Sequence, residues 1–137
     1  MKLYYTPGAC SLASHIVLCE CGLPYTLERV DLRNKTIADG RDFLTINPLG
    51  YVPVLELNNG EILTDGTAIL YYLADLVPSA GLVPPAGEVA RYRLLAWLNF
   101  IGSELHKNFS PLFGKDTPPE YKAQVSTRLA ARFAHVD

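Results

Sequence analysis

The chain has 137 residues, of which 49% are hydrophobic, and a formal net charge of −2. This length fits one ordinary domain or two small ones, and the near-neutral charge does not favour nucleic-acid binding. No apolar run approaches the roughly 18 residues of a membrane span, and the N-terminus does not have the pattern of a signal peptide. The three cysteines are an odd, clustered set rather than a disulfide framework, so the composition predicts a cytoplasmic protein.

The first half of the chain is expected to form a mixed α/β domain. A strand is predicted over 2–6 and a helix over 11–21, with Leu12, Ile16 and Cys19 on its apolar face. The two halves of a β-α-β unit run parallel, whereas strands joined by the Asn-Asn-Gly turn at 58–60 run antiparallel. The pattern therefore predicts a mixed four-stranded sheet with helices packed against it. The remaining elements are, in order, a second strand at 25–30, a polar loop at 31–42, a helical turn at 43–46, strands at 52–57 and 62–63, and a helix from 65 to about 76.

The second half of the chain is expected to be helical. Residues 78–87 are rich in proline and glycine and are predicted to form a linker. One long helix is expected from 88 to about 113 and a second after 117. The predicted domains are therefore 1–77 and 88–137. Because two helices make a thin domain, we expect residues 88–137 to be part of a larger helical bundle.

Cys10 is the first candidate for chemistry. It follows a Pro-Gly turn and precedes the first helix, where unpaired N–H groups and the helix dipole favour a thiolate. A small structural thiol is an equally good interpretation of this position alone. Tyr5 and Ser11 are close in sequence, and each has a hydroxyl that can donate a hydrogen bond to a bound thiolate.

Three further positions indicate a binding site for a peptide-like ligand. Pro53 enters a predicted edge strand, which leaves the Val52 backbone able to pair with an extended chain. Asp65 begins a helix, either as its N-cap or as the partner of an ammonium group, and the N–H groups there can hold a carboxylate. Lys35, in the polar loop, either pairs with a carboxylate or is solvated.

The remaining polar candidates lie on predicted helices. Asn99, Ser103 and His106 share one face of the long helix, which looks either into a cleft or into solvent. His15 is expected to be packed or capping. Cys19 and Cys21 are expected to be structural thiols rather than a metal or redox pair, and no metal site is predicted.

The ordered combination of these motifs resembles the glutathione transferases. Cys10, together with Trp97-Leu98-Asn99 and Glu104-Leu105-His106-Lys107, resembles their bacterial beta class. The resemblance implies a thioredoxin-like N-terminal domain, an all-helical C-terminal domain, a homodimer and a cis peptide bond before Pro53. It rests on Tyr5-x4-Cys10-Ser11, Asn47-Pro48-x-Gly50-x-Val52-Pro53, Leu63-Thr64-Asp65-Gly66, Ala68-Ile69 and Tyr72-Leu73-Ala74.

The resemblance also implies how glutathione binds. The backbone of Val52, between Tyr51 and Pro53, would pair with the cysteinyl part of the tripeptide. Its γ-glutamyl end would meet Asp65 and the Gly66 N–H, and its glycine carboxylate would meet Lys35. The residues implied at the glutathione sulfur are Cys10, Tyr5, Ser11, Asn99 and His106.

The activity implied by the resemblance is enzymatic. Glutathione, the co-substrate, would be conjugated to small hydrophobic electrophiles in detoxification, or would take part in thiol–disulfide exchange through Cys10. The alternative is a related protein that binds a ligand or a protein partner without turnover. Two departures from the family bear on this choice. Gly66 replaces a serine of many relatives, and relatives continue through further helices.

Overall fold

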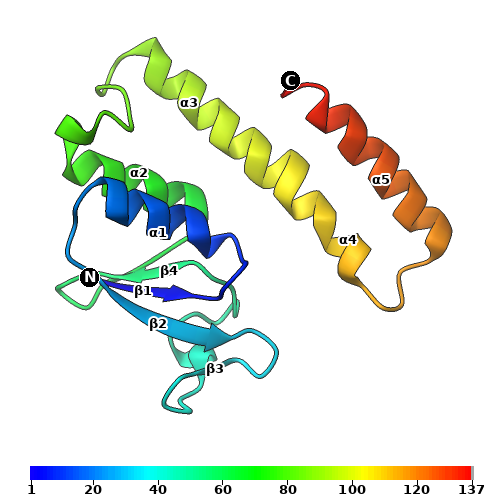
Figure 1. The fold of residues 1–137 in the computed structure, drawn as a ribbon, viewed down its shortest axis with the longest axis horizontal. Helices are drawn as coiled ribbons and strands as arrows, with labels where there is room; N and C mark the ends of the chain where they lie inside the picture. The colour runs from blue at the N-terminus through cyan, green and yellow to red at the C-terminus, as the bar shows by residue number, and fades with distance from the viewer. Residues whose placement is uncertain (137) are drawn as a thin grey trace. The chain divides into compact units, whose positions relative to one another are not determined.

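The computed structural model describes residues 1–136 and divides the chain into two compact units, Met1–Pro85 and Ala86–Asp137. Within residues 1–136, no helix has both the length and the apolar character needed to cross a membrane. The first unit contains β1 (Lys2–Tyr5), α1 (Ser11–Glu20), β2 (Thr26–Asp31), β3 (Thr36–Ile37), the 3₁₀ turn η1 (Phe43–Thr45), β4 (Val54–Glu56), β5 (Ile62–Thr64), α2 (Gly66–Leu76) and the 3₁₀ turn η2 (Pro78–Ala80) (Figure 1).

The first unit has a single mixed sheet in the order β3-β2-β1-β4-β5. β1 runs parallel to β2, and β4 runs antiparallel to β5, so the predicted strand directions are confirmed. The sheet has five strands rather than the predicted four, because the polar loop contains the short strand β3. Ile37 of β3 pairs with Val30 of β2 and is buried. Two residues are too few to show the alternation by which a strand is recognised in a sequence.

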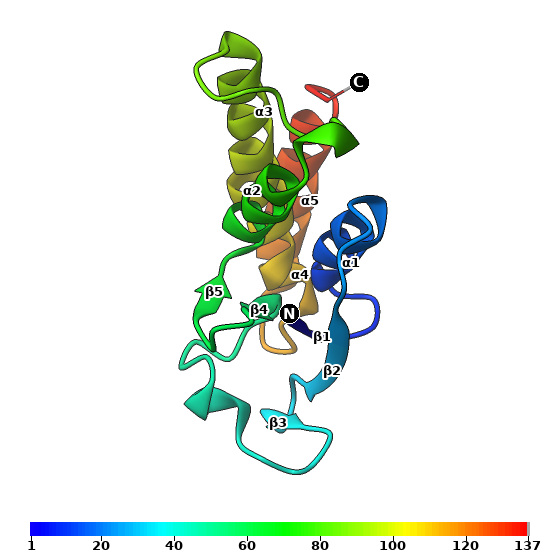
Figure 2. The same cartoon turned by 90° about the vertical axis from the view of Figure 1, so that its left-hand side faces the viewer.

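Alternation along the strands builds a core on each face of this sheet. Leu3 and Leu55 pack under α1 and α2, which lie on the same side of the sheet (Figure 2). The intervening residues Tyr4 and Val54 point the other way and pack around Phe43 of η1. The first unit is therefore a thioredoxin-like fold with helices against one face.

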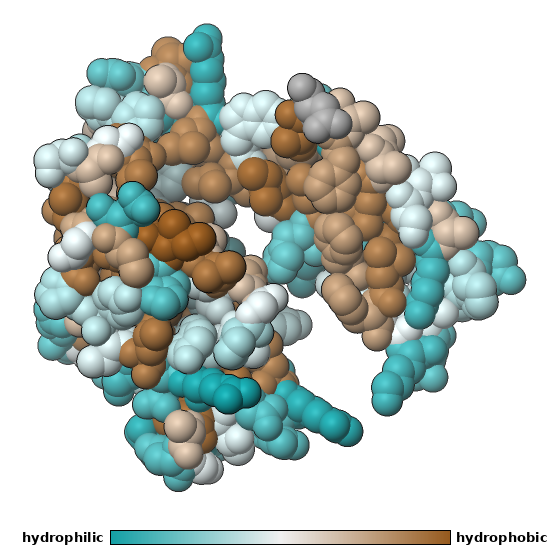
Figure 3. All heavy atoms as spheres, in the orientation of Figure 1, coloured by the Kyte–Doolittle hydropathy of each residue, from teal (hydrophilic) through white to brown (hydrophobic). Residues whose placement is uncertain are grey.

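The prediction for the buried face of α1 is wrong. Ser11, Ser14 and Leu18 are buried, whereas Leu12 and Ile16 are both more than half exposed. α1 packs against α2, and hydrophobicity alone gives no weight to serine as a buried residue. Figure 3 shows hydrophobic residues exposed beside hydrophilic ones on the surface.

The second unit is helical, but its predicted long helix is interrupted. The segment consists of α3 (Val89–Phe100), the π-helical turn η3 (Ile101–Leu105), the 3₁₀ turn η4 (His106–Phe109) and α4 (Ser110–Phe113), and it is followed by α5 (Pro119–Phe133). Leu105 packs with Val125 and Leu129 of α5 in a small core. Arg132 of α5 also forms a 2.8 Å ion pair with Glu104 of η3. These contacts hold the interrupted segment and α5 together in one helical unit.

Candidate functional site

The turn that leads into β4 is fixed by two residues of the Asn47-Pro48-x-Gly50 motif. Asn47 is buried, its side-chain amide donates to the Tyr51 carbonyl at 2.9 Å, and its Oδ1 accepts from the Leu49 N–H at 3.2 Å. Gly50 has φ 65°, and a Cβ there would lie 3.1 Å from the Leu44 side chain. The motif therefore sets the path of the backbone into Val52.

The Val52–Pro53 peptide bond is cis, which confirms the geometry that the family resemblance implies. The predicted edge position is wrong, because β4 pairs with β1 on one side and with β5 on the other. Val52 and Pro53 nevertheless precede the paired residues of β4. Among residues 1–136, nothing accepts a hydrogen bond from the Val52 N–H. A backbone donor therefore stays available beside an inner strand.

Cys10 lies next to this turn as the N-cap residue of α1. Its thiol donates a hydrogen bond to the Val52 carbonyl, with Sγ and O 3.2 Å apart. Burial of the thiol raises the pKa of Cys10, the N–H groups of Cys10 and Ser11 act in the opposite direction, and the Asp65 carboxylate adds to the rise. The helix N–H groups thus act as the sequence predicts, but burial outweighs them and favours the thiol in the ligand-free site.

The start of α2 forms the second wall of the site. Asp65 has φ 72° and caps the helix, accepting from the N–H groups of Thr67 at 2.9 Å and Ala68 at 3.3 Å. The Gly66 N–H has no partner within the described part of the chain. A Cβ on Gly66 would lie 3.9 Å from the Pro53 ring, an ordinary contact, so this helix start lies directly beside the cis-proline turn. One backbone donor at a helix N-terminus is thus open to an anion.

Lys35 reaches the same turn from the loop before β3. Its Nζ donates to the Gly50 carbonyl at 2.9 Å and lies 5.9 Å from the centre of the Tyr51 ring. The ammonium group is therefore held against the turn instead of being fully solvated. Lys35 has φ 56°, a backbone conformation uncommon outside glycine, and its carbonyl accepts from the Phe43 N–H at 2.8 Å.

Tyr5 and Ser11 have packing roles in the ligand-free structure. Ser11 is fully buried, and its hydroxyl accepts from the Thr6 N–H at 3.2 Å and donates to the Thr6 carbonyl at 3.3 Å. These bonds fasten the loop before Cys10 to the helix. Tyr5 is partly buried against the core beneath α1 and α2. A hydrogen bond from either hydroxyl to a bound sulfur stays a prediction.

Two further candidates, Asn99 and His106, lie in the second unit. Asn99 lies in α3 and His106 begins η4, so the π-helical turn between them breaks the regular spacing that predicted a common face. The Asn108 side-chain amide donates to the carbonyls of Ser103 at 3.0 Å and Glu104 at 2.9 Å and steadies this turn. Sequence reasoning missed Asn108, because a π-helical turn has no periodic signal. Such turns are frequent at functional sites.

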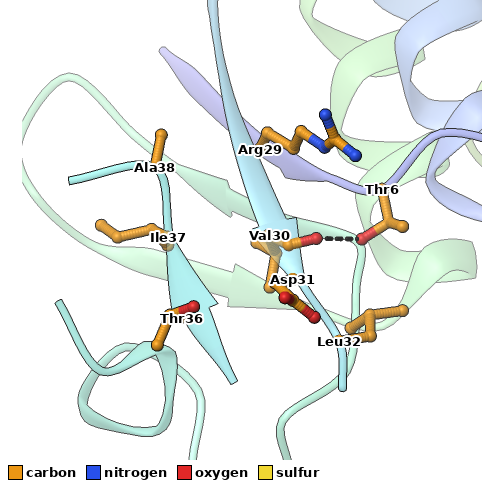
Figure 4. A pocket seen from close by; sticks show the side chains of 8 residues that line it. All are labelled: Thr6, Arg29, Val30, Asp31, Leu32, Thr36, Ile37 and Ala38. Carbon is orange, nitrogen blue, oxygen red and sulfur yellow. Dashed lines mark hydrogen bonds between the residues drawn. The ribbon is translucent and has the colours of Figure 1, made fainter. Parts of the chain in front are cut away.

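An open pocket of about 470 Å³ lies elsewhere, against β2 and β3 (Figure 4). It contains none of the candidate site residues. The Thr6 hydroxyl at its rim donates to the Val30 carbonyl at 2.7 Å, which ties the loop before Cys10 to β2. Its lining residues are Thr6, Arg29, Val30, Asp31, Leu32, Thr36, Ile37 and Ala38. Within residues 1–136, no three His, Cys, Asp or Glu side chains cluster as metal ligands.

Comparisons with known proteins find close relatives over the whole chain. Residues 8–76 match the family model "Glutathione S-transferase, N-terminal domain". The glutathione S-transferase GstA of Escherichia coli O157:H7 is 50% identical over 137 residues, which are all of this chain and 68% of that protein. The glutathione S-transferase GST-4.5 of Xanthomonas campestris is 43% identical over all of this chain and 69% of its own length.

Solved structures give the same result. The bacterial transferase BphK, in a ternary complex, superposes with a TM-score of 0.97 at 53% identity, over 99% of this chain and 68% of BphK. A sphingomonad glutathione S-transferase complexed with glutathione has a TM-score of 0.95 at 48% identity, over 99% and 68%. The beta-class transferase of Sphingomonas chungbukensis has a TM-score of 0.94 at 47% identity, over the same shares.

Proposed function

Because the chain belongs to the glutathione S-transferase family, we propose that it is a transferase that binds glutathione at the Val52–Pro53 turn and conjugates it to small hydrophobic electrophiles. Glutathione is the co-substrate, and no metal takes part in the proposal. A cytoplasmic location, a role in detoxification and assembly as a homodimer belong to the same proposal. The similarity to beta-class structures supports it.

The proposal rests on one observation: several polar groups lie around the Val52–Pro53 turn. Two of them, the N–H groups of Val52 and Gly66, have no partner in the described part of the chain, and Lys35 is bound to a carbonyl that a ligand could replace. Glutathione is extended and charged at both ends, so it needs a backbone partner, an anion site and a cation site. The Val52 N–H would donate to the cysteinyl carbonyl of the tripeptide. The Gly66 N–H would donate to the γ-glutamyl carboxylate, and Asp65 would accept from the γ-glutamyl ammonium. Lys35 would exchange the Gly50 carbonyl for the glycine carboxylate.

Cys10 would lie beside the glutathione sulfur in this pose. The N–H groups of Cys10 and Ser11 stabilise negative charge on a sulfur at the start of α1, which helps glutathione to attack an electrophile as its thiolate. Cys10 can also take part in thiol–disulfide exchange. Its thiolate would attack a glutathione mixed disulfide, form a Cys10–glutathione disulfide and release the other sulfur as a thiol. Tyr5, Asn99 and His106 are proposed as further donors to the sulfur.

Binding and turnover test the proposal together. The 137-residue chain should be retained on immobilised glutathione, be eluted by free glutathione, and conjugate a chlorodinitrobenzene, measured by the absorbance of the product. A chain that passes through the column unretained would contradict the proposed site.

A second function, glutathione binding without turnover, is favoured by one observation. The Cys10 sulfur is present as a thiol that donates to Val52 rather than as an activated thiolate. This alternative predicts retention on the column with no conjugation of any electrophile and no reduction of any mixed disulfide tested. Measurable turnover by this chain would exclude it.

A further inference from the structure

Three titratable side chains, His15, Cys19 and Tyr25, form a cluster toward the C-terminal half of α1, away from Cys10. His15 and Cys19 are four residues apart and so share a face of the helix. Tyr25, just before β2, places its hydroxyl 2.8 Å from His15 Nε2 and 3.2 Å from Cys19 Sγ. The His15 and Tyr25 rings meet edge to face, with centroids 5.3 Å apart and planes at 77°. The phenol oxygen thus bridges a thiol and an imidazole.

This arrangement forms a path for a proton. In the tautomer of His15 that accepts at Nε2, the Cys19 thiol donates to the Tyr25 oxygen and the Tyr25 hydroxyl donates to His15. When the thiol ionises, its proton moves to Tyr25 as the phenol proton moves to His15. The hydrogen bond with Cys19 raises the pKa of Tyr25, and burial adds to the rise. The phenol therefore keeps a proton with which to bind the thiolate.

We infer that Cys19 is a second reactive thiol, which forms a mixed disulfide with a small disulfide such as oxidised glutathione, with Tyr25 and His15 as its proton relay. The Cys19 thiolate attacks one sulfur, a new S–S bond forms, and the S–S bond of the small disulfide breaks. The leaving sulfur departs as glutathione thiolate. Cys19 is oxidised, one glutathione sulfur is reduced, and the thiol proton ends on His15, from which it passes to solvent.

The surroundings of the three cysteines separate Cys19 from the other two. Cys19 is exposed, so a disulfide reaches it. Cys21 is buried, its thiol donates to the Leu73 carbonyl at 3.7 Å, and burial raises its pKa. Cys19 lies in the last turn of α1, and its sulfur is 3.2 Å from the Tyr25 hydroxyl. The His15–Tyr25 pair is therefore the feature that sets Cys19 apart from the other two thiols.

The test uses the full 137-residue chain with Cys10→Ser, so that exchange at the proposed glutathione site does not consume the reagent. The chain is incubated with oxidised glutathione, quenched with an alkylating agent, and the modification rates of Cys19 and Cys21 are measured by peptide mass spectrometry. We expect Cys19 to be modified while Cys21 stays protected. Tyr25→Phe and His15→Gln should each lower the rate of Cys19 modification at least about tenfold, because positioned acid–base groups raise reaction rates on the order of 10²- to 10⁴-fold.

The matched control is Tyr92→Phe, which removes an exposed phenol hydroxyl in the second unit and should leave the Cys19 rate unchanged. A variant in which Cys21 stays protected from modification is folded. If only one of Tyr25→Phe and His15→Gln folds, that variant is sufficient to decide the outcome. An unmodified Cys19, or equal rates in the parent chain and a folded relay variant, would overturn the inference. Neither result bears on the proposed function, because Cys10 is absent and affinity for glutathione is not measured.

Discussion

Asp65 combines two duties that substitutions can separate. Its carboxylate caps α2 through the N–H groups of Thr67 and Ala68, and in the proposed pose it also binds the γ-glutamyl ammonium. Asp65→Asn keeps an oxygen for the cap and removes the charge. Asp65→Ala removes both the charge and the cap, and it leaves alanine at a φ of 72°, which favours glycine. Asp65→Gly removes the side chain but accepts this backbone conformation without strain.

Stability and affinity should change by different amounts in the three variants. Loss of the cap to alanine costs about 0.5–2 kcal/mol, whereas a glycine costs only roughly a few tenths. We therefore expect the free energy of unfolding, measured in urea, to fall clearly for Asp65→Ala and little for Asp65→Asn or Asp65→Gly. Asp65 is exposed, so its ion pair with the ligand is worth about 1 kcal/mol or less. All three variants should weaken glutathione binding by up to about fivefold.

Calorimetric titration with glutathione measures this loss. Asp116→Asn, the same change at an exposed carboxylate of the second unit, is the control and should leave affinity unchanged. The difference between the parent chain and Asp65→Asn should shrink in high salt, because salt screens an exposed ion pair. If Asp65→Asn binds glutathione as tightly as the parent at low salt, then Asp65 does not bind the ammonium and the proposed orientation of the tripeptide is wrong.

Three other substitutions test separate parts of the account. Cys10→Ala should lower glutathione-dependent disulfide reduction to what exchange at Cys19 sustains but leave binding to immobilised glutathione, and unchanged reductase activity would refute the exchange role. Asn47→Ala should cost about 0.5–1.5 kcal/mol in urea unfolding, because it removes the hydrogen bond that the buried Asn47 amide donates to the Tyr51 carbonyl; a stability equal to the parent's would mean that the amide does not hold the turn. The Tyr4 hydrogen bond lowers the pKa of Glu56, so its stabilising effect is present above the unfolded-state pKa and is lost as pH falls through the folded-state pKa. Glu56→Gln should therefore reduce the loss of unfolding free energy that occurs as pH falls. An unchanged loss would mean that the Glu56 carboxylate does not contribute to it.

Much of the first unit follows from local rules of sequence. The parallel and antiparallel pairings come from the type of connection between strands, and the Asn47 and Gly50 motif predicts the turn that carries Val52. The candidate residues Cys10 and Asp65 stand at helix starts, which the sequence marks by the Pro-Gly turn before Cys10 and by the N-cap residue Asp65 itself.

Other features depend on packing that a sequence does not display. Ser11 and Ser14 are buried although they are polar, which reverses the face predicted for α1. β3 is too short to show the alternation of a strand. The π-helical turn before His106 lies in a segment whose periodicity predicts one ordinary helix. The pKa of Cys10 is set mainly by burial, which outweighs the helix N–H groups and cannot be deduced from the position of Cys10 in the chain.

The central claim is that the Val52–Pro53 turn holds the cysteinyl part of glutathione. A crystal structure of this chain with glutathione tests it most directly. The account predicts the cysteinyl carbonyl within hydrogen-bond distance of the Val52 N–H, with the glutathione sulfur beside Cys10 Sγ. Glutathione bound instead in the pocket against β2 and β3, with the Val52 N–H still without a partner, would contradict it.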